Sequence, residues 1–181
     1  MRFLLVFFLS VFAVSLQAQN PAEAYVNKYD SLALEVLNTY SIPASLVLGI
    51  ALQESGGGTS KLCVTKHNHF GVKGRVKSGK TKSGYVTTYR SFESDEAAYL
   101  HFGKMVSGKK YYPGLRNNMD YMKWLKAMKS AKYASSSTWV SRVDNIIRKY
   151  DLTRFDTPPS EIIPFAPAVT DSILVREKNN P

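Results

Sequence analysis

Apolar residues first recur at helical spacing between residues 22 and 40. The positions expected to face inward are Val26, Tyr29, Ala33, Val36, Leu37 and Tyr40. They fall three, four or seven residues apart, which is the spacing of one face of an α-helix, and charged residues lie between them. The pattern predicts a half-buried helix over residues 22–40.

The next segment, residues 44–54, is apolar on nearly every side. Pro43 suits the first position of a helix, and a helix that is apolar all round is typical of one covered on every side. Gly56, Gly57 and Gly58 follow it, and glycine commonly ends a helix. We therefore expect a central helix that ends at Glu54.

The pattern changes between residues 68 and 92. The stretches "HFGVKGRV" and "GYVTTYRSF" flank the polar segment "KSGKTKSG", an arrangement that predicts two short strands joined by a turn. Helical signals return with "SDEAAYLHFGKMV", which opens on a capping Ser and two acids. Two further helices are expected in "NNMDYMKWLKAMKSA" and in "SSSTWVSRVDNIIRKYDL", the latter with an inward stripe of Trp139, Val143, Ile146, Ile147 and Tyr150. The predicted fold class is mainly α (α+β), a helical domain with a small β-hairpin lobe.

The two ends of the chain differ from its middle. Residues 1–18 contain one Arg, then an apolar run, then small and polar residues, which is the plan of a secretory signal and is short for a membrane span. Residues 157–181 hold five of the eight prolines and show no helical period, so we expect a flexible tail. The predicted organisation is a signal over 1–18, a domain over 19–156 and a tail over 157–181. The protein is expected in the periplasm or outside the cell.

The charge of the chain is strongly positive, with a formal net charge of +10 and a pI of about 9.6. Between Glu54 and Glu93 there are eight Lys or Arg and no acid. Such a field attracts a polyanion, which for an exported protein means cell-wall polymer, anionic lipid or stray nucleic acid. Export argues against nucleic acid as the physiological partner, and a basic surface kept for solubility is the alternative interpretation.

Glu54 is the strongest candidate for chemistry. Apolar surroundings disfavour a charged carboxylate, and the partial negative charge at a helix C-terminus does the same. Both favour the protonated form that a general acid needs. The glycines that follow would let a bulky polymer approach the backbone. A helix-end residue facing water, or a buried ion pair, would also explain this position.

Other candidates are weaker. His67 and His69 are two positions apart and lack a nearby third ligand, so we expect no metal site. Cys63, the only cysteine, lacks a catalytic partner and is expected to be a small buried hydrophobe. No P-loop, dinucleotide fingerprint or nucleophile elbow is present, and we expect no cofactor. Aromatic rings can stack on sugar faces, and the tyrosines near predicted element ends are Tyr85, Tyr89, Tyr111, Tyr112 and Tyr133.

Five sequence blocks, taken in order, resemble the endo-N-acetylglucosaminidase domain of glycoside hydrolase family 73, found in bacterial autolysins. The blocks are "ALQESGGGTS", "NHFGVKG", "YRSFES", "KKYYPGL" and "AKYASSSTWVSRVDNIIRKYDL". The resemblance implies a lysozyme-like helical fold with a β-lobe, peptidoglycan as the partner, and hydrolysis of the β-1,4 bond after N-acetylglucosamine. It also implies that Glu54 is the general acid and that the Tyr133 phenol lies near the reacting sugar. The substrate-binding residues implied by the matching blocks are Asn68, Phe70, Gly71, Tyr89 and Tyr112.

One departure from the family affects the mechanism. Members often carry a second acid in the β-lobe, whereas Glu93, Asp95 and Glu96 are the nearest here and are explained by a helix start. We therefore favour the hypothesis that the substrate's own 2-acetamido group attacks the anomeric carbon. A lytic transglycosylase that cuts after N-acetylmuramic acid and a non-catalytic wall-binding module are the alternatives. The oligomeric state is unknown at this stage.

Overall fold

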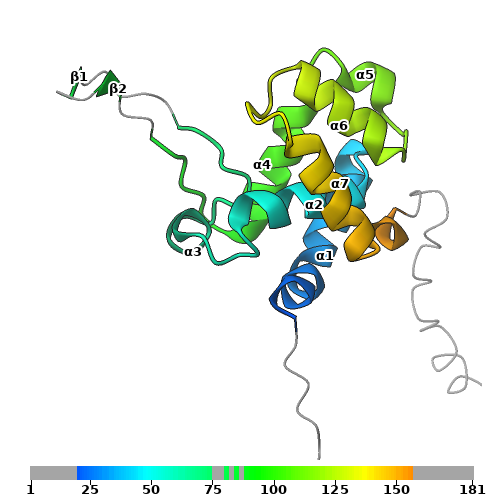
Figure 1. Cartoon of the computed structure of the whole chain (residues 1–181), viewed down its shortest axis with the longest axis horizontal. Helices are drawn as coiled ribbons and strands as arrows, with labels where there is room; N and C mark the ends of the chain where they lie inside the picture. Colours follow the sequence, from blue (N-terminus) through cyan, green and yellow to red (C-terminus); the bar gives the residue numbers. More distant parts are fainter. Residues whose placement is uncertain (1–19, 75–79, 82–83, 86–87, 157–181) are drawn as a thin grey trace, which may run out of the picture.

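The computed structural model describes residues 20–74, 80–81, 84–85 and 88–156. The predicted signal over 1–18 and the predicted tail over 157–181 lie outside these residues. The described part is mainly α-helical, as expected, with the helices gathered around α2 and a two-stranded hairpin to one side (Figure 1). Within it, no helix is both long and apolar enough to cross a membrane.

The first two helices form the centre of the fold. Helix α1 spans Pro21–Tyr40 and α2 spans Ala44–Ser55. Every residue of α2 from 44 to 52 is buried, and the helix contacts α1, α6, α7 and the 3-10 helix η1, Leu152–Phe155. The prediction of a covered central helix is confirmed. Pro43 differs slightly from expectation, because it precedes the helix as its N-cap.

The first turn of α2 is satisfied by a residue from the far end of the domain. Pro43 has no side chain that can cap the helix. Instead, the Ser45 backbone N–H donates to Oδ1 of Asp156 at 2.8 Å, and the Ser45 hydroxyl donates to Oδ2 of the same carboxylate. A carboxylate at a helix N-terminus also complements the helix dipole. The end of the described chain is therefore tied to the helix that carries Glu54.

The remaining helices surround α2. They are α3, Lys61–Lys66; α4, Asp95–Ser107; α5, Tyr112–Leu115; α6, Tyr121–Ser130; and α7, Trp139–Lys149. Ser94 caps α4 as predicted, since its hydroxyl accepts from the backbone N–H of Ala97 at 3.1 Å. The sequence did not predict α3 or α5, because each is too short to show a hydrophobic period.

The hairpin is antiparallel, and its second strand begins where predicted, but its first strand does not. Strand β1, Lys80–Thr81, lies inside the segment expected to be the turn, and it pairs with β2, Gly84–Tyr85. The first strand was placed wrongly because residues 77–84 are all polar or glycine, so no alternation of apolar and polar residues marks a strand there. Nearer the helices, a bridge between Lys73 and Tyr89 keeps the two arms antiparallel.

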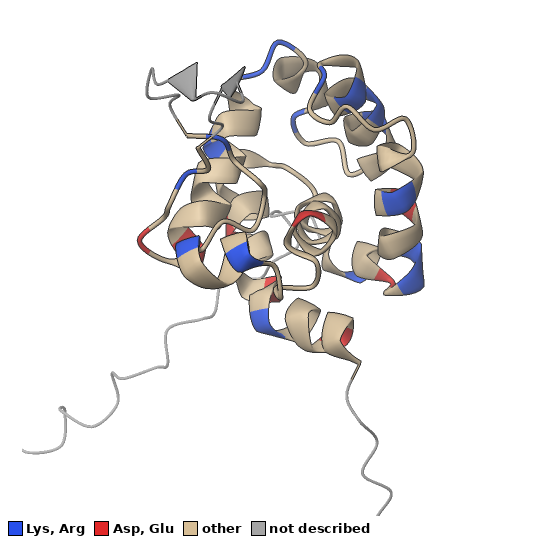
Figure 2. Cartoon of the chain, turned by 60° about the vertical axis from the view of Figure 1, so that its left-hand side comes forward, with Lys and Arg blue, Asp and Glu red and all other residues tan. Residues whose placement is uncertain are grey.

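Lys and Arg residues are found on most of the helices, whereas acidic residues are few (Figure 2). In the lobe, the side chains of Lys77, Lys80 and Lys82 lie outside the described structure. The proposed attraction of this lobe to a polyanion therefore stays a prediction.

Helices α2 and α7 approach each other closely at Gly49. A Cβ at this position would lie 2.6 Å from Cγ1 of Ile147 and 3.3 Å from Cγ1 of Val143. We expect Gly49→Ala to destabilise the protein by about 1–3 kcal/mol through overpacking, measured as a lower thermal midpoint. Gly114→Ala is the matched control, because nothing lies within 4 Å of a Cβ there. Equal midpoints for the two variants would contradict the close approach.

Candidate active site

Glu54 is partly exposed at the penultimate position of α2, and its carboxyl group is held by Trp139. The indole N–H of Trp139, the first residue of α7, donates to Oε1 of Glu54 at 2.9 Å. Trp139 is buried, with 2% of its surface exposed, so the donor is fixed by packing. The bond sets the orientation of the carboxyl group and leaves Oε2 available for chemistry.

Gly71 lies beside this second oxygen. Its backbone has a φ of 62°, in the left-handed region that favours glycine. A Cβ added at this position would lie 3.8 Å from Oε2 of Glu54. Any side chain here would therefore strain the loop and contact the oxygen that Trp139 leaves free. The sequence block that contains Gly71 is thus brought next to the candidate acid.

Tyr133 supplies a hydroxyl group to the same region. It lies in the loop between α6 and α7, with its ring centroid 5.2 Å from that of Trp139. Its hydroxyl oxygen is buried and has no hydrogen-bond partner within the described residues. Burial raises the pKa of the phenol far above its ordinary value, and the charges of Glu54 and Tyr111 raise it further. The hydroxyl therefore stays protonated and available as a donor.

Two neighbours of this group were not assigned to the site from the sequence. Trp139 was placed only on the inward stripe of its helix, and nothing in a linear pattern shows which way an indole N–H points. Tyr111 was noted only as one of several tyrosines near element ends. Burial raises the pKa of Tyr111 to about 12, and its ring meets Trp124 edge-on.

Asn68 and Phe70 support the loop that carries Gly71. The amide of Asn68 donates to the carbonyls of Val72 and Arg90 at 2.9 and 2.8 Å, and its oxygen accepts from the Val72 N–H at 2.9 Å. Phe70 is buried and stacks on Phe102, with ring centroids 4.2 Å apart. Both residues hold the loop from within. Direct contact with a sugar stays a prediction.

Tyr89 and Tyr112 are placed differently from each other. The Tyr89 side chain is exposed, at 39%, so its ring is accessible for stacking. The Tyr112 hydroxyl donates to the backbone carbonyl of Tyr40 at 2.6 Å, so this phenol is used inside the protein. Their roles in substrate binding also stay predictions.

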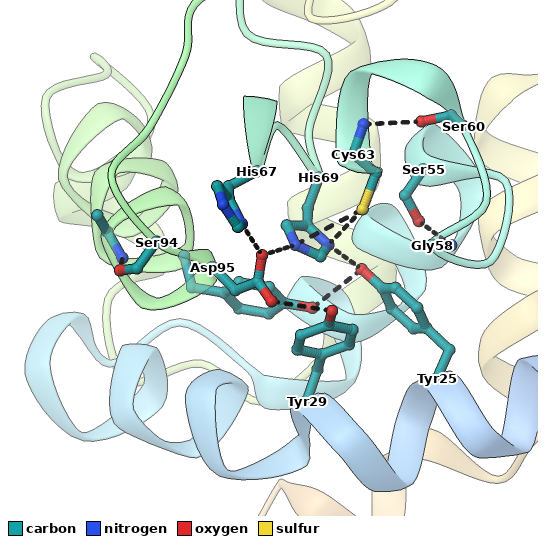
Figure 3. A network of polar contacts seen from close by, with 12 residues as sticks. Tyr25, Tyr29, Ser55, Gly58, Ser60, Cys63, His67, His69, Ser94 and Asp95 are labelled. Carbon is teal, nitrogen blue, oxygen red and sulfur yellow. Dashed lines mark hydrogen bonds and ion pairs between the residues drawn. The ribbon is translucent and has the colours of Figure 1, made fainter. Parts of the chain in front are cut away.

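A second polar cluster is centred on Asp95 and includes His67 and His69, two residues of the segment that leads to Gly71 (Figure 3). Oδ1 of Asp95 lies 2.7 Å from Nδ1 of His67 and 2.9 Å from Nε2 of His69, and Oδ2 accepts from the Tyr29 hydroxyl at 3.0 Å. The other ring nitrogen of His69 lies 2.7 Å from the Tyr25 hydroxyl. The cluster thus joins α1, α4 and the segment that follows α3.

The protonation of this cluster follows from its contacts. An ionised carboxylate can only accept hydrogen bonds, so Nε2 of His69 must be protonated and donate the hydrogen bond to Asp95. Burial lowers the pKa of His69, which leaves a neutral ring whose Nδ1 accepts from Tyr25. Burial alone would raise the pKa of Asp95, but hydrogen bonds from His69, His67 and Tyr29 outweigh it and hold the pKa at about 2.

Cys63, His69 and Asp95 together suggest a nucleophilic triad, but the geometry excludes it. Sγ of Cys63 lies 3.4 Å from Nδ1 and 3.7 Å from Nε2 of His69. The sulfur is therefore at a similar distance from both ring nitrogens and is not directed at either one. Nδ1 already accepts from Tyr25, and the ring has no free base for a thiol. Cys63 is buried, and burial raises its pKa, which is the opposite of an activated cysteine.

The cluster also accounts for one of the acids considered as a second catalytic carboxylate. Asp95 is engaged by two histidines and a tyrosine, whereas Glu93 and Glu96 are exposed. Within the described residues no group of His, Cys, Asp and Glu has an arrangement that could hold a metal ion. Asp95 is therefore committed to the cluster, whereas Glu54 accepts from Trp139 through only one of its two carboxyl oxygens.

The Asp95 cluster predicts a specific loss of stability in acid. The folded pKa of Asp95 is about 2, below the ordinary value of 3.8 for this side chain, so its contribution to stability is fully present above about pH 4 and is lost as pH falls towards 2. We expect the thermal midpoint of the parent to fall across this range, and that of Asp95→Asn to start lower and change less. Parallel curves for the two proteins would contradict this assignment.

Comparison with known proteins finds a family match over most of the chain. The glucosaminidase family, described as mannosyl-glycoprotein endo-beta-N-acetylglucosaminidase, matches residues 30–152. The exo-glucosaminidase LytG of Bacillus subtilis (strain 168) is 25% identical over 172 residues, which cover 84% of this chain and 60% of LytG. A probable N-acetylmuramidase of Lactococcus lactis subsp. lactis (strain IL1403) is 27% identical over 77% of this chain and 36% of its own length. The chain thus spans about 60% or less of these two relatives.

The fold is similar to that of a solved autolysin domain. The catalytic domain of the autolysin Auto from Listeria monocytogenes superimposes with a TM-score of 0.65 at 21% identity, covering 80% of this chain and 92% of that one. At this level of identity the likeness concerns the fold. It agrees with the lysozyme-like helical architecture expected from the sequence.

Proposed function

Because the chain belongs to the glucosaminidase family, we propose that it is an exported endo-β-N-acetylglucosaminidase. Its substrate is peptidoglycan, and the bond cleaved is the β-1,4 bond after N-acetylglucosamine. The observation that carries this proposal is the combination of Glu54, oriented by Trp139 at 2.9 Å, with the buried hydroxyl of Tyr133, which has no hydrogen-bond partner among the described residues. The Tyr133 ring contacts Trp139, so an oriented carboxyl group and an available hydroxyl donor belong to one group of side chains.

Glu54 is the general acid in this proposal. Its Oε2, which lies near Gly71, protonates the glycosidic oxygen as the bond to the anomeric carbon breaks. The Trp139 bond keeps the carboxyl group in one orientation, which is the positioning that general acid catalysis requires. After the leaving chain departs, the same carboxylate takes a proton from the attacking water.

The nucleophile is the 2-acetamido group of the substrate. A protein nucleophile would need a second carboxyl group within roughly 5 to 5.5 Å of the first. The lobe has no acid between Glu54 and Glu93, and Asp95 is committed to the histidine cluster. The acetamido oxygen instead attacks the anomeric carbon to form an oxazolinium ion, which water then opens. Two displacements at one carbon retain its configuration.

Tyr133 stabilises this intermediate. Its hydroxyl stays protonated over the working range of pH, because burial raises its pKa. A donor held in a site that excludes water acts strongly on charge that develops in the transition state. We assign the hydrogen bond of the Tyr133 hydroxyl to the acetamido group of the reacting sugar.

The remaining predicted residues bind or support the glycan. Tyr89, whose ring is exposed, stacks on a sugar face, and Tyr112 lies in another of the matching blocks. Asn68, Phe70 and Gly71 form the loop beneath the acid.

The products of peptidoglycan digestion test the proposal. The protein is incubated with purified peptidoglycan, and the new sugar ends are identified by mass spectrometry after borohydride reduction. Reduced N-acetylglucosamine ends on fragments of many lengths are expected. Anhydromuramic ends would identify a lytic transglycosylase, reduced muramic acid ends a muramidase, and release of single sugars an exo-acting enzyme. Wall binding without cleavage would identify a binding module.

A further inference from the structure

The loop over residues 131–138 contains Tyr133 and is followed directly by Trp139, the two residues that the proposal combines with Glu54. Tyr133 lies near its beginning, and Trp139 follows directly after its end. The position of both side chains relative to Glu54 therefore depends on what fixes this loop.

Lys129, in the last turn of α6, fixes the centre of the loop. Its ammonium group donates to three successive backbone carbonyls, those of Ala134 at 3.0 Å, Ser135 at 3.1 Å and Ser136 at 2.7 Å. An ammonium group has three N–H donors, so each carbonyl has one. Three carbonyl oxygens that converge on one point repel each other through their partial negative charges, so a cation at that point stabilises this loop conformation.

Backbone and side-chain bonds hold the ends of the loop but not its centre. The Tyr133 N–H donates to the Met128 carbonyl at 3.0 Å, and the Arg142 guanidinium donates to the Ser136 hydroxyl at 3.0 Å. Within the described residues, Lys129 is the donor to the carbonyls of Ala134 and Ser135. Without it, these two residues would be free to rearrange between fixed ends.

We propose that Lys129 is a positioning residue, whose ammonium group holds the 131–138 loop so that Tyr133 and Trp139 stay beside Glu54. The inference rests on the proposed roles of Glu54 and Tyr133 in glycan cleavage. Arginine is not an equivalent residue here, because its donors lie in a rigid plane and cannot converge on three carbonyls as an ammonium group does.

Lys129→Met tests the proposal, since it keeps an unbranched side chain only one atom shorter and removes the ammonium group. We expect kcat on peptidoglycan to fall by about 10- to 100-fold, because a small misplacement of catalytic groups has effects of this size, while KM changes little. Hydrogen exchange should become faster over 131–138 and remain unchanged in α1 and α2. Lys126→Met is the matched control, because Lys126 is exposed on the same helix, and parent behaviour is expected.

A chemical rescue separates the charge from the rest of the side chain. Lys129→Cys is made in a Cys63→Ala background and alkylated with 2-bromoethylamine, which places an ammonium group at the same number of bonds from the backbone as in lysine. The same variant treated with iodoacetamide gives a neutral side chain of similar length. The aminoethyl product should recover both kcat and slow exchange over 131–138, and the neutral product should recover neither.

The outcomes are distinguishable from failure of the proposed function. Parent-like exchange over 131–138 in Lys129→Met overturns the inference whatever the activity, and so does equal recovery by both alkylated products. A loosened loop in a protein whose parent form does not cleave peptidoglycan supports the anchoring role of Lys129 and counts against the proposed function.

Discussion

Glu54→Gln is expected to lower the rate of peptidoglycan cleavage by about 10²–10⁴-fold, the usual contribution of a general acid. The amide keeps an oxygen that can accept the Trp139 indole N–H, now 2.9 Å from Oε1, so the contact between α2 and α7 should survive. The variant cannot donate a proton to the leaving oxygen. The measurement is the rate of release of new reducing ends, together with the thermal midpoint as a control for folding.

Glu93→Gln and Glu96→Gln are the matched controls for this experiment. Both residues are exposed near the start of α4, and we expect both variants to retain parent activity. A loss in Glu93→Gln as large as that in Glu54→Gln, with the fold intact, would replace the acetamido mechanism by one with two acids.

Tyr133→Phe should make the protein more stable and less active. The hydroxyl is buried without a partner among the described residues, and removing an unsatisfied polar group recovers a desolvation penalty of about 1–3 kcal/mol. For a chain of this size that is a rise of about 2–4 °C in thermal midpoint per kcal/mol. If the hydroxyl binds the reacting acetamido group, its loss should lower kcat by about 10²–10³-fold.

Tyr112→Phe provides a comparison with the same chemical change and the opposite expectation for stability. Its hydroxyl donates to the Tyr40 carbonyl at 2.6 Å, so its removal should destabilise the protein by about 0.5–1.5 kcal/mol. A lower thermal midpoint in Tyr133→Phe, comparable to that in Tyr112→Phe, would show that the Tyr133 hydroxyl has a partner within the protein.

The helices were predictable where burial repeats regularly along the chain. Residues 22–40 and 44–54 follow their patterns closely, because each buries a continuous face or its whole surface against neighbours. Helix α3 has six residues, too few to show a period. The first strand of the hairpin was missed because Lys80 and Thr81 lie in a run of polar residues, so no alternation of apolar and polar residues marks a strand there.

The site was predictable only in part, for a similar reason. Glu54 stands out in the sequence because a charged residue ends an apolar helix before three glycines. The partner of its carboxyl group, Trp139, is 85 residues away, and their bond depends on how α2 crosses α7. Lys129 looks like any lysine at a helix end, since the three carbonyls that it binds converge only in the folded loop.

The bond between Ser45 and Asp156 affects the order in which the protein can be completed. The two residues are 111 positions apart, so the first turn of the helix that carries Glu54 lacks this partner until the ribosome has added residue 156. A nascent chain that stops earlier cannot close this contact. Completion of the first turn of α2 is thereby coupled to synthesis of residue 156, and a fragment that ends before this residue would carry Glu54 on an incompletely capped helix.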